Sequence, residues 1–238
     1  DVLGTNIFNV KTQEFEFHQG PIFSDIVLVD EINRAPAKTQ AALFEVMEER
    51  QVSMDGVTYP MGDLYTILAT QNPVEQEGTY RLPEAQLDRF LMKVTMGYPS
   101  ADDELEILKR HEQRTDLVKL SDVNPVLTKE EVLQLRSYMN DVVIDESLLR
   151  YITQIVQQTR SSRAVYLGAS PRASVAMLQA SKAYALLQGR DFVTPEDIKA
   201  VTPSILQHRL VLTAEAEMEG YSAYKVAMKL IDKVEVPK

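Results

Sequence analysis

The stretch IVLVDE, residues 26–31, decides the fold of this chain. Its four apolar residues, three of them β-branched, predict a strand buried on both faces, as in the middle of a parallel sheet covered by helices. The strand ends in two adjacent carboxylates, and an unpaired carboxylate is costly away from water. Ligands of open α/β sheets bind beyond the carboxyl ends of the strands. The sequence therefore places Asp30 and Glu31 at a candidate ligand site.

Asp30 and Glu31 together have the form of a Walker B motif. In that motif the Asp holds Mg²⁺ through its water shell, and the Glu orients or deprotonates the water that attacks a γ-phosphate. The alternative is a helix whose first turn carries acids, because acids complement the helix dipole. Nucleotide chemistry also needs a loop of the form GxxxxGK[ST], and the chain has no Gly-Lys dipeptide. Since it also begins without an initiator methionine, we expect it to be a piece of a longer polypeptide.

Composition argues against several other classes of function. The 238 residues suit one large domain or two ordinary ones. No apolar run reaches the length of a membrane span and no signal core is present, which predicts a soluble, cytoplasmic protein without membrane insertion. The chain has no cysteine and its three histidines lie far apart, which argues against a transition-metal site. A net charge of −10 without a basic stripe argues against nucleic acid as a partner.

The first hundred residues predict two hairpins and a second buried strand. Alternating apolar residues at 8–17 predict a hairpin with one apolar face. The Asp-Gly pair within residues 51–59 predicts another. Residues 64–69 predict an apolar strand, and Asn72 lies just beyond its carboxyl end, as Asp30 lies beyond the first. If these strands are parallel neighbours, the side chains share one crevice.

A domain boundary is expected near the break Gly97-Tyr98-Pro99-Ser100. Before it, residues 73–81 predict a loop, residues 82–90 predict a short helix beginning at the proline, and residues 90–94 predict a third strand. No convincing strand follows the break. We therefore predict a partial α/β domain at 1–98 and a helical domain at 99–238.

The helical domain is well marked by local signals. Three capping-box patterns are present, at Ser100 with Asp103, Thr128 with Glu131, and Thr194 with Asp197. Two apolar stripes predict core faces: Val132, Leu135, Met139 and Val142, and then Leu148, Ile152, Ile155 and Val156. Arg172 lies in the first turn of an alanine-rich helix, where a cation opposes the helix dipole and favours a nearby anion. The alternative is a solvated arginine whose penalty is screened by salt.

Several long motifs occur in one order along the chain. They are DEINRAPAKTQAALFEVMEERQV (30–52), DGVTYP (55–60), ILATQNPVEQEGTY (67–80), LPEAQLDRF (82–90) and GASPRA (168–173). Together they resemble the MoxR family of AAA+ ATPases, over the whole chain. The resemblance implies an α/β P-loop NTPase core with a parallel sheet, here without its Walker A part, followed by a helical lid domain.

The resemblance also implies a role for each candidate residue. Asp30 would hold Mg²⁺, Glu31 would be the catalytic carboxylate, and Asn72 would be the sensor-1 residue that places the attacking water. Arg89 matches the arginine finger, which reaches the neighbouring subunit's nucleotide. Arg172 matches the sensor-2 arginine, which contacts the γ-phosphate from the lid. These roles suit phosphoryl transfer, which depends on positioning and on cations facing the developing charge.

Further expectations follow from the same resemblance. It implies ATP and Mg²⁺ as cofactors, a homo-oligomeric ring that is typically a hexamer, and a von Willebrand factor A-type protein or a metalloenzyme as client of a chaperone-like remodelling activity. The hairpins would face the ring's pore or a partner, or else would merely extend a sheet edge, and Arg34 would have a local or intersubunit role.

Two other hypotheses for the function stay open. One is a non-catalytic interaction module derived from a truncated paralogue, and the other is a magnesium-chelatase-like motor subunit. Without a phosphate loop, this chain alone is expected to leave strand edges unpaired and not to turn over ATP.

Overall fold

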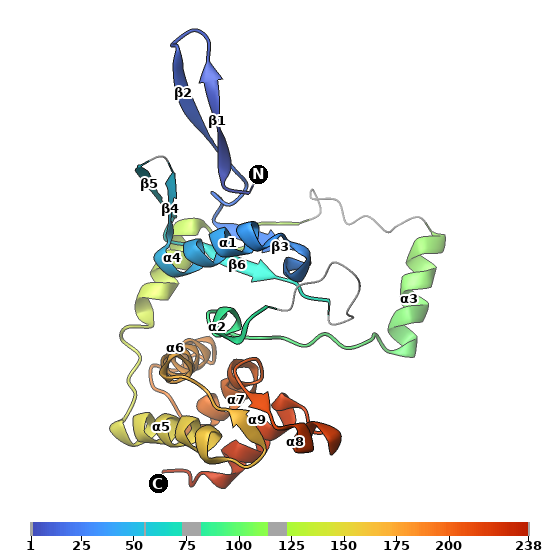
Figure 1. Ribbon diagram of the computed structural model, residues 1–238. Coiled ribbons are helices and arrows are strands. Elements are labelled where there is room, and N and C mark those ends of the chain that lie inside the picture. Colours follow the sequence, from blue (N-terminus) through green and yellow to red (C-terminus); the bar gives the residue numbers. More distant parts are fainter. Residues whose placement is uncertain (1, 55, 73–81, 114–122, 238) are drawn as a thin grey trace.

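The computed structural model describes residues 2–54, 56–72, 82–113 and 123–237. These residues form an α/β core, with a helical bundle packed below it in the view of Figure 1. The core contains β1 (Gly4–Asn9), β2 (Glu14–Gln19), β3 (Ile26–Val29), η1 (Ile32–Arg34), α1 (Ala37–Glu49), β4 (Gln51–Met54), β5 (Val57–Pro60), β6 (Thr66–Ala69) and α2 (Glu84–Leu87). The helical half contains α3 (Ala101–Glu112), α4 (Lys129–Tyr138), α5 (Glu146–Ser161), β7 (Val165–Leu167), α6 (Pro171–Leu187), α7 (Pro195–Leu206), β8 (Val211–Leu212), α8 (Ala214–Met218) and α9 (Ala223–Lys233).

Strands β3 and β6 are parallel neighbours. This is the arrangement that Asp30 and Asn72 need in order to share one crevice. The described residues pack against only one face of this sheet. Val27 is 8% exposed and belongs to a core cluster with α1, whereas Ile26 and Leu28 are each 67% exposed. The prediction that this strand is buried on both faces is therefore wrong for the described part of the chain, because α1 covers one face and no described element buries the other.

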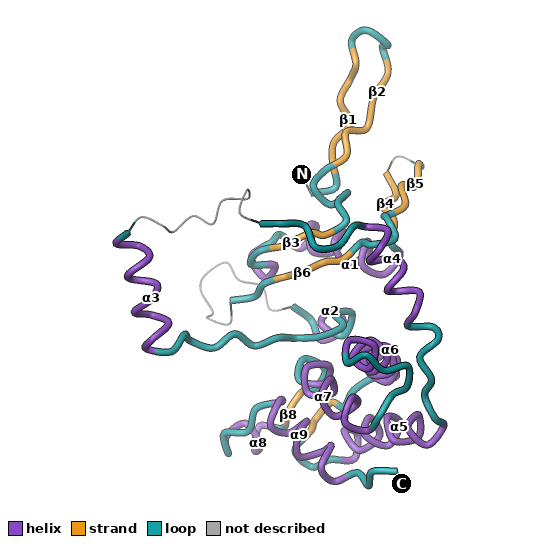
Figure 2. The backbone as a smooth tube through the Cα atoms, turned by 180° about the vertical axis from the view of Figure 1, so that it is seen from behind, coloured by secondary structure: helices purple, strands orange, loops and turns teal. Residues whose placement is uncertain are grey.

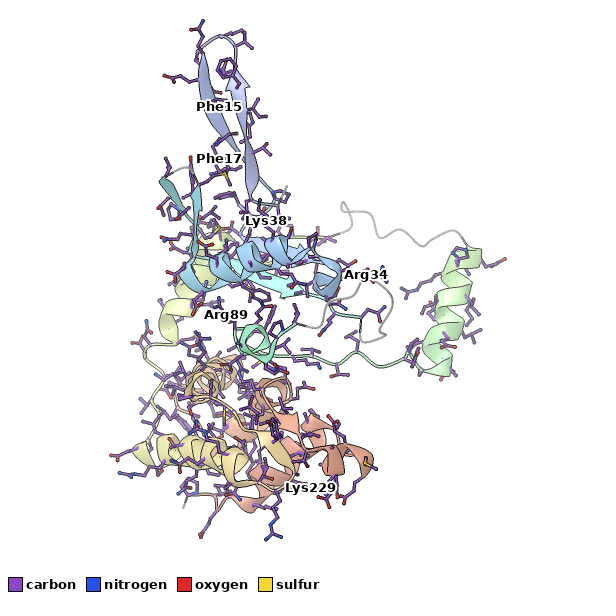
Figure 3. All side chains as sticks on the ribbon, in the orientation of Figure 1. Phe15, Phe17, Arg34, Lys38, Arg89 and Lys229 are labelled. Carbon is purple, nitrogen blue, oxygen red and sulfur yellow. The ribbon has the colours of Figure 1, made fainter. Side chains whose placement is uncertain are left out.

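Both predicted hairpins are present. Strand β1 pairs antiparallel with β2, and β4 pairs antiparallel with β5. Each pair is a two-stranded sheet separate from β3 and β6, so neither hairpin extends an edge of the parallel sheet. Both project from the core on the same side, and Phe15 lies further out along the first hairpin than Phe17 (Figure 1, Figure 3). The ring of Phe17 lies 4.7 Å from that of Tyr59, so the two hairpins contact each other near their bases.

The predicted third strand at 90–94 is not a strand in the structure. Its backbone bonds instead to the end of α7, where the Lys93 amide donates to the Ser204 carbonyl at 2.9 Å and Gln207 Nε2 donates to the Lys93 carbonyl at 2.5 Å. A strand forms only beside a partner strand, and none of the described strands pairs with this segment. The expected short helix is present as α2, while the expected loop at 73–81 lies outside the described residues.

The helical half has one apolar core, which extends from Val142 to Ile231. The predicted stripe on α5 is buried in it, from Leu148 to Val156. Of the other predicted stripe only Val142 is buried, and Leu135 on α4 is 43% exposed. Helix α4 instead contacts the α/β core through an ion pair of 2.7 Å between Lys129 Nζ and Asp25 Oδ1. The boundary at residue 98 stays a prediction.

The three predicted capping boxes are present, and Ser170 caps α6 by accepting from the Arg172 amide. Helix α3 stands apart from the other elements, both in Figure 1 and from behind in Figure 2. Among the described residues, no helix is both long and apolar enough to cross a membrane.

Candidate functional site

The carboxyl ends of β3 and β6 bring the first three candidate residues to one edge of the sheet. Ladder pairing continues past the strands, because the Thr70 amide donates to the Val29 carbonyl at 2.9 Å and the Ile32 amide donates to the Thr70 carbonyl at 3.0 Å. Asp30, Glu31 and the segment from Thr70 to Asn72 therefore leave the sheet side by side. Asp30 and Asn72 can belong to one site only if they lie at the same edge of the sheet, and the structure places them there.

Thr70 ties the Asp30 carboxylate to the backbone of Glu31, and sequence reasoning missed it. Its hydroxyl donates to Asp30 Oδ1 and accepts from the Glu31 amide at 2.8 Å. One side chain thus fixes the orientation of the Asp30 carboxylate and the path of the backbone through Glu31. The available signal was its position, since Thr70 is the first polar residue after the apolar strand β6.

Glu31 has a left-handed backbone conformation, with φ 48° and ψ 52°. Few non-glycine residues adopt it, and such residues are common at functional sites. The side chain of Glu31 is 37% exposed and pairs with Arg34 Nη1 at 3.1 Å. Arg34 therefore makes a local contact with the predicted catalytic carboxylate.

Asn72 lies at the same edge and is joined to η1. Its carbonyl accepts from Nδ2 of the buried Asn33 at 3.3 Å. Gln40, also buried, donates from Nε2 to the Ile32 carbonyl at 3.1 Å, which ties η1 to the first turns of α1. The loops that carry Asp30, Glu31 and Asn72 are thus braced by buried amide side chains.

The two candidate arginines meet elsewhere, on Glu48. Arg89 Nη1 lies 2.6 Å from Glu48 Oε2 and donates to the Phe44 carbonyl at 2.8 Å. Arg172 Nη2 lies 2.6 Å from Glu48 Oε1. The core supplies Arg89 and the helical bundle supplies Arg172, so one carboxylate joins the two halves. The side chain of Arg89 is 29% exposed, which places this ion pair at the margin of the core and not inside it.

The carboxylate edge and the arginine pair lie at opposite ends of α1. This helix begins at Ala37, just after η1, and Glu48 is its next-to-last residue. At 1.5 Å per residue the two positions are about 16 Å apart along the axis. Figure 3 shows Arg34, the last residue of η1, lying away from Arg89, which is near α2. Within one chain the structure therefore groups Asp30, Glu31 and Asn72, and separately groups Arg89 with Arg172.

A buried clamp around Asp88 fixes the segment that carries Arg89. Arg209, whose side chain is 3% exposed, donates from Nε to Asp88 Oδ1 at 2.8 Å. Ser170 Oγ donates to Asp88 Oδ2 at 2.8 Å. Burial lowers the pKa of Arg209, and Asp88 opposes that shift.

The same clamp holds the backbone of the segment by its carbonyl groups. The guanidinium of Arg209 also donates to the carbonyls of Asp88 at 3.0 Å, Phe90 at 2.5 Å, Leu91 at 3.1 Å and Ile205 at 2.5 Å. His208 Nε2 bonds to the Phe90 carbonyl at 3.0 Å, so this nitrogen carries the hydrogen. The pKa of His208 is lowered to about 4, mainly by burial, and this keeps the ring neutral.

Comparison with known proteins identifies the class. Residues 1–92 match the family model described as "ATPase family associated with various cellular activities (AAA)", and residues 157–229 match the "AAA lid domain". A solved structure of a putative ATPase from Cytophaga hutchinsonii superposes with a TM-score of 0.89 at 42% identity, covering 100% of this chain and 74% of that one. The fold is therefore that of an AAA+ ATPase core followed by its lid domain.

The relatives narrow this class to one family. The chain is 48% identical over 237 residues to the uncharacterized protein YeaC of Bacillus subtilis, covering all of this chain and 73% of that protein. It is 40% identical over 246 residues to the chaperone MoxR1 of Mycobacterium tuberculosis, covering all of this chain and 64% of the relative. Magnesium-chelatase subunits are less similar in sequence to this chain, with 26% identity over 194 residues for a ChlI homolog of Methanocaldococcus jannaschii. The chain belongs to the MoxR family of AAA+ ATPases.

Proposed function

We propose that this chain is the Walker B, sensor and lid part of a ring-forming ATPase in which each ATP lies between two subunits. One subunit supplies Asp30, Glu31 and Asn72, and its neighbour supplies Arg89 and Arg172. The observation that carries the proposal is the separation of these two groups along α1. In the observed arrangement one chain does not bring all five side chains to one triphosphate, whereas adjacent copies in a ring can.

The carboxylate edge has the chemistry that Mg²⁺ and ATP require. Mg²⁺ binds one or two carboxylates together with water and phosphate oxygens. The Thr70 hydroxyl donates to Oδ1 of Asp30, so Oδ2 is the oxygen that would hold Mg²⁺ through water. When bound, Mg²⁺ neutralises charge on the phosphates.

The remaining residues then have separate roles. Glu31 orients and deprotonates the attacking water, and Asn72 helps to place it. The guanidinium groups of Arg89 and Arg172 face the charge that develops on the transferred phosphoryl group.

We also propose that hydrolysis drives chaperone-like remodelling of a client, a von Willebrand factor A-type protein or a metalloenzyme, by a cytoplasmic hexamer. The name of the relative MoxR1 supports a chaperone role. The hairpin of β1 and β2 is the candidate contact, because it projects from the core and exposes Phe8, Val10 and Phe15 by 48%, 79% and 71%. Apolar side chains displayed in this way are typical of protein-binding surfaces.

Phosphate release by the full-length protein tests the ATPase proposal. Glu31→Gln should retain ATP binding and lose about 10²-fold or more in kcat, which is the usual contribution of a general base. The matched control is Glu45→Gln, an exposed glutamate on α1 that should change kcat less than twofold. The 238-residue chain alone should release no phosphate, because it has no phosphate loop.

Three outcomes would contradict this proposal. Hydrolysis by the full-length protein that survives Glu31→Gln would remove Glu31 from its role. Glu31-dependent hydrolysis by the 238-residue chain would show that no further segment is needed. A full-length protein that binds its ring partners without any hydrolysis would instead support the non-catalytic interaction module.

A further inference from the structure

Glu48 divides its two carboxylate oxygens between two arginines. Oε2 pairs with Arg89 Nη1 and Oε1 pairs with Arg172 Nη2, both at 2.6 Å. Arg89 is fixed further by the Phe44 carbonyl, while the Arg172 guanidinium has no second acceptor among the described residues. Glu48 is 36% exposed, so the bridge lies at the surface, where a larger anion can reach both guanidinium groups.

We propose that Glu48 is a positioning residue that couples Arg89 to Arg172, so that both guanidinium groups engage the neighbouring subunit's triphosphate as one unit. This inference rests on the proposed function. Two cations brought close together repel each other, and a carboxylate between them offsets that repulsion. Without Glu48 each arginine would have to be ordered separately when the triphosphate arrives, and groups ordered in advance lose less entropy on binding.

Arg172 has a particular need for this partner. It lies in the first turn of α6, where the helix dipole is unfavourable for a cation. Glu48 supplies the anion that this position favours. The sequence left open whether Arg172 has an anionic partner or is solvated, and the structure places its partner at the end of α1, 124 residues away.

A purely structural role for Glu48 predicts something different. The core and the bundle are already joined by Arg209 and Ser170, which hold Asp88 in a mostly buried clamp. The pairs of Glu48 are partly exposed, and exposed ion pairs contribute little to stability. If Glu48 were only another tether, its loss would leave the kinetic coupling between Arg89 and Arg172 unchanged.

The test is a double-mutant cycle in the full-length ATPase. The kcat for ATP is measured for wild type, Arg89→Lys, Arg172→Lys and the double variant, and the cycle is repeated in a Glu48→Gln background. Lysine keeps the charge at each site but loses the planar guanidinium. With Glu48 present, we expect the combined effect to differ at least fivefold from the product of the single effects. In the Glu48→Gln background we expect the effect of the double variant to agree within twofold with the product of the single effects. Glu48→Gln itself should change the KM for ATP less than it changes kcat.

The adjacent Glu49 provides the matched control, since it is also exposed at the end of α1. The cycle in a Glu49→Gln background should retain the wild-type coupling. Coupling that persists in Glu48→Gln, that is absent in wild type, or that is lost equally in Glu49→Gln would overturn the inference. If neither Arg→Lys change alters kcat, then the proposed function fails at these arginines, which is a separate result.

Discussion

The clamp around Asp88 gives the sharpest prediction for stability, through Arg209→Met. In the native protein the guanidinium satisfies one carboxylate oxygen and four backbone carbonyls. Methionine fills a similar volume but donates no hydrogen bond. The substitution removes a donor from each of these acceptors, of which the Phe90 carbonyl keeps His208 Nε2, and it leaves the Asp88 carboxylate, 18% exposed, without its cation.

The expected loss follows from these contacts. Removing one partner of a buried ion pair costs roughly 3–5 kcal/mol. Ser170 still donates to Asp88 and the carboxylate keeps some contact with water, so we expect about 3 kcal/mol, at the low end. Arg209→Lys should cost less, about 2 kcal/mol, because an ammonium keeps the charge but has three donors for five acceptors.

Urea unfolding of the 238-residue chain, followed by circular dichroism, measures these losses. Amide hydrogen exchange at Lys93 should also accelerate, because its amide bonds to the Ser204 carbonyl across the same junction. The matched control is Arg150→Met, which removes an exposed pair with Glu146 and should change stability by less than about 0.5 kcal/mol. A loss below about 1 kcal/mol for Arg209→Met would refute the view that this clamp joins core and bundle.

Three further predictions concern pH and the carboxylate edge. Burial raises the pKa of Asp197, but Arg190 and the Thr194 cap outweigh it and the net shift is downward, so Asp197 contributes stability above its unfolded pKa. Asp197→Asn should therefore lower the urea midpoint at pH 7, and its difference from wild type should shrink as the pH falls below about 4. His208 binds its proton near pH 6.5 when unfolded but only near pH 4 when folded, so wild-type stability should fall by about 3 kcal/mol as the pH drops between these values. His208→Gln should flatten that slope in urea titrations, and an unchanged slope would contradict the assignment. Thr70→Val in the full-length protein should lower kcat about tenfold, since it frees Asp30 from its orienting hydroxyl, and an unchanged kcat would argue against that role.

Local patterns predicted the parts of the site that depend on short stretches of chain. Asp30 and Asn72 each follow an apolar strand, and parallel strands necessarily bring such residues to one edge of a sheet. The hairpins followed from alternation and from an Asp-Gly turn. Capping boxes located the starts of three helices, because the cap residues contact each other within four positions.

Contacts between distant parts of the chain were not predictable in the same way. Glu48 belongs to a run of acidic residues on an exposed helix face, and nothing in that run distinguishes the glutamate that meets Arg89 and Arg172. Arg209 resembles any basic residue after a helix until its burial is known.

Two errors share one physical cause. The sequence of residues 90–94 predicts a strand, and the sequence of residues 26–29 predicts a strand buried on both faces. Both readings depend on neighbours that the pattern of one segment does not reveal, because strand pairing and burial are properties of the assembled sheet. In the described residues no strand pairs with the first segment and no element covers the second face.

The most direct test of an ATP site shared between subunits is complementation between two inactive variants of the full-length protein. Glu31→Gln lacks the catalytic carboxylate, and Arg89→Ala lacks the finger. In a mixed ring, a subunit with Arg89→Ala still has Glu31, and a Glu31→Gln neighbour can supply Arg89 to it. The account predicts that mixing the two variants restores phosphate release well above the sum of the separate activities. A mixture no more active than that sum, in rings shown to exchange subunits, would contradict it.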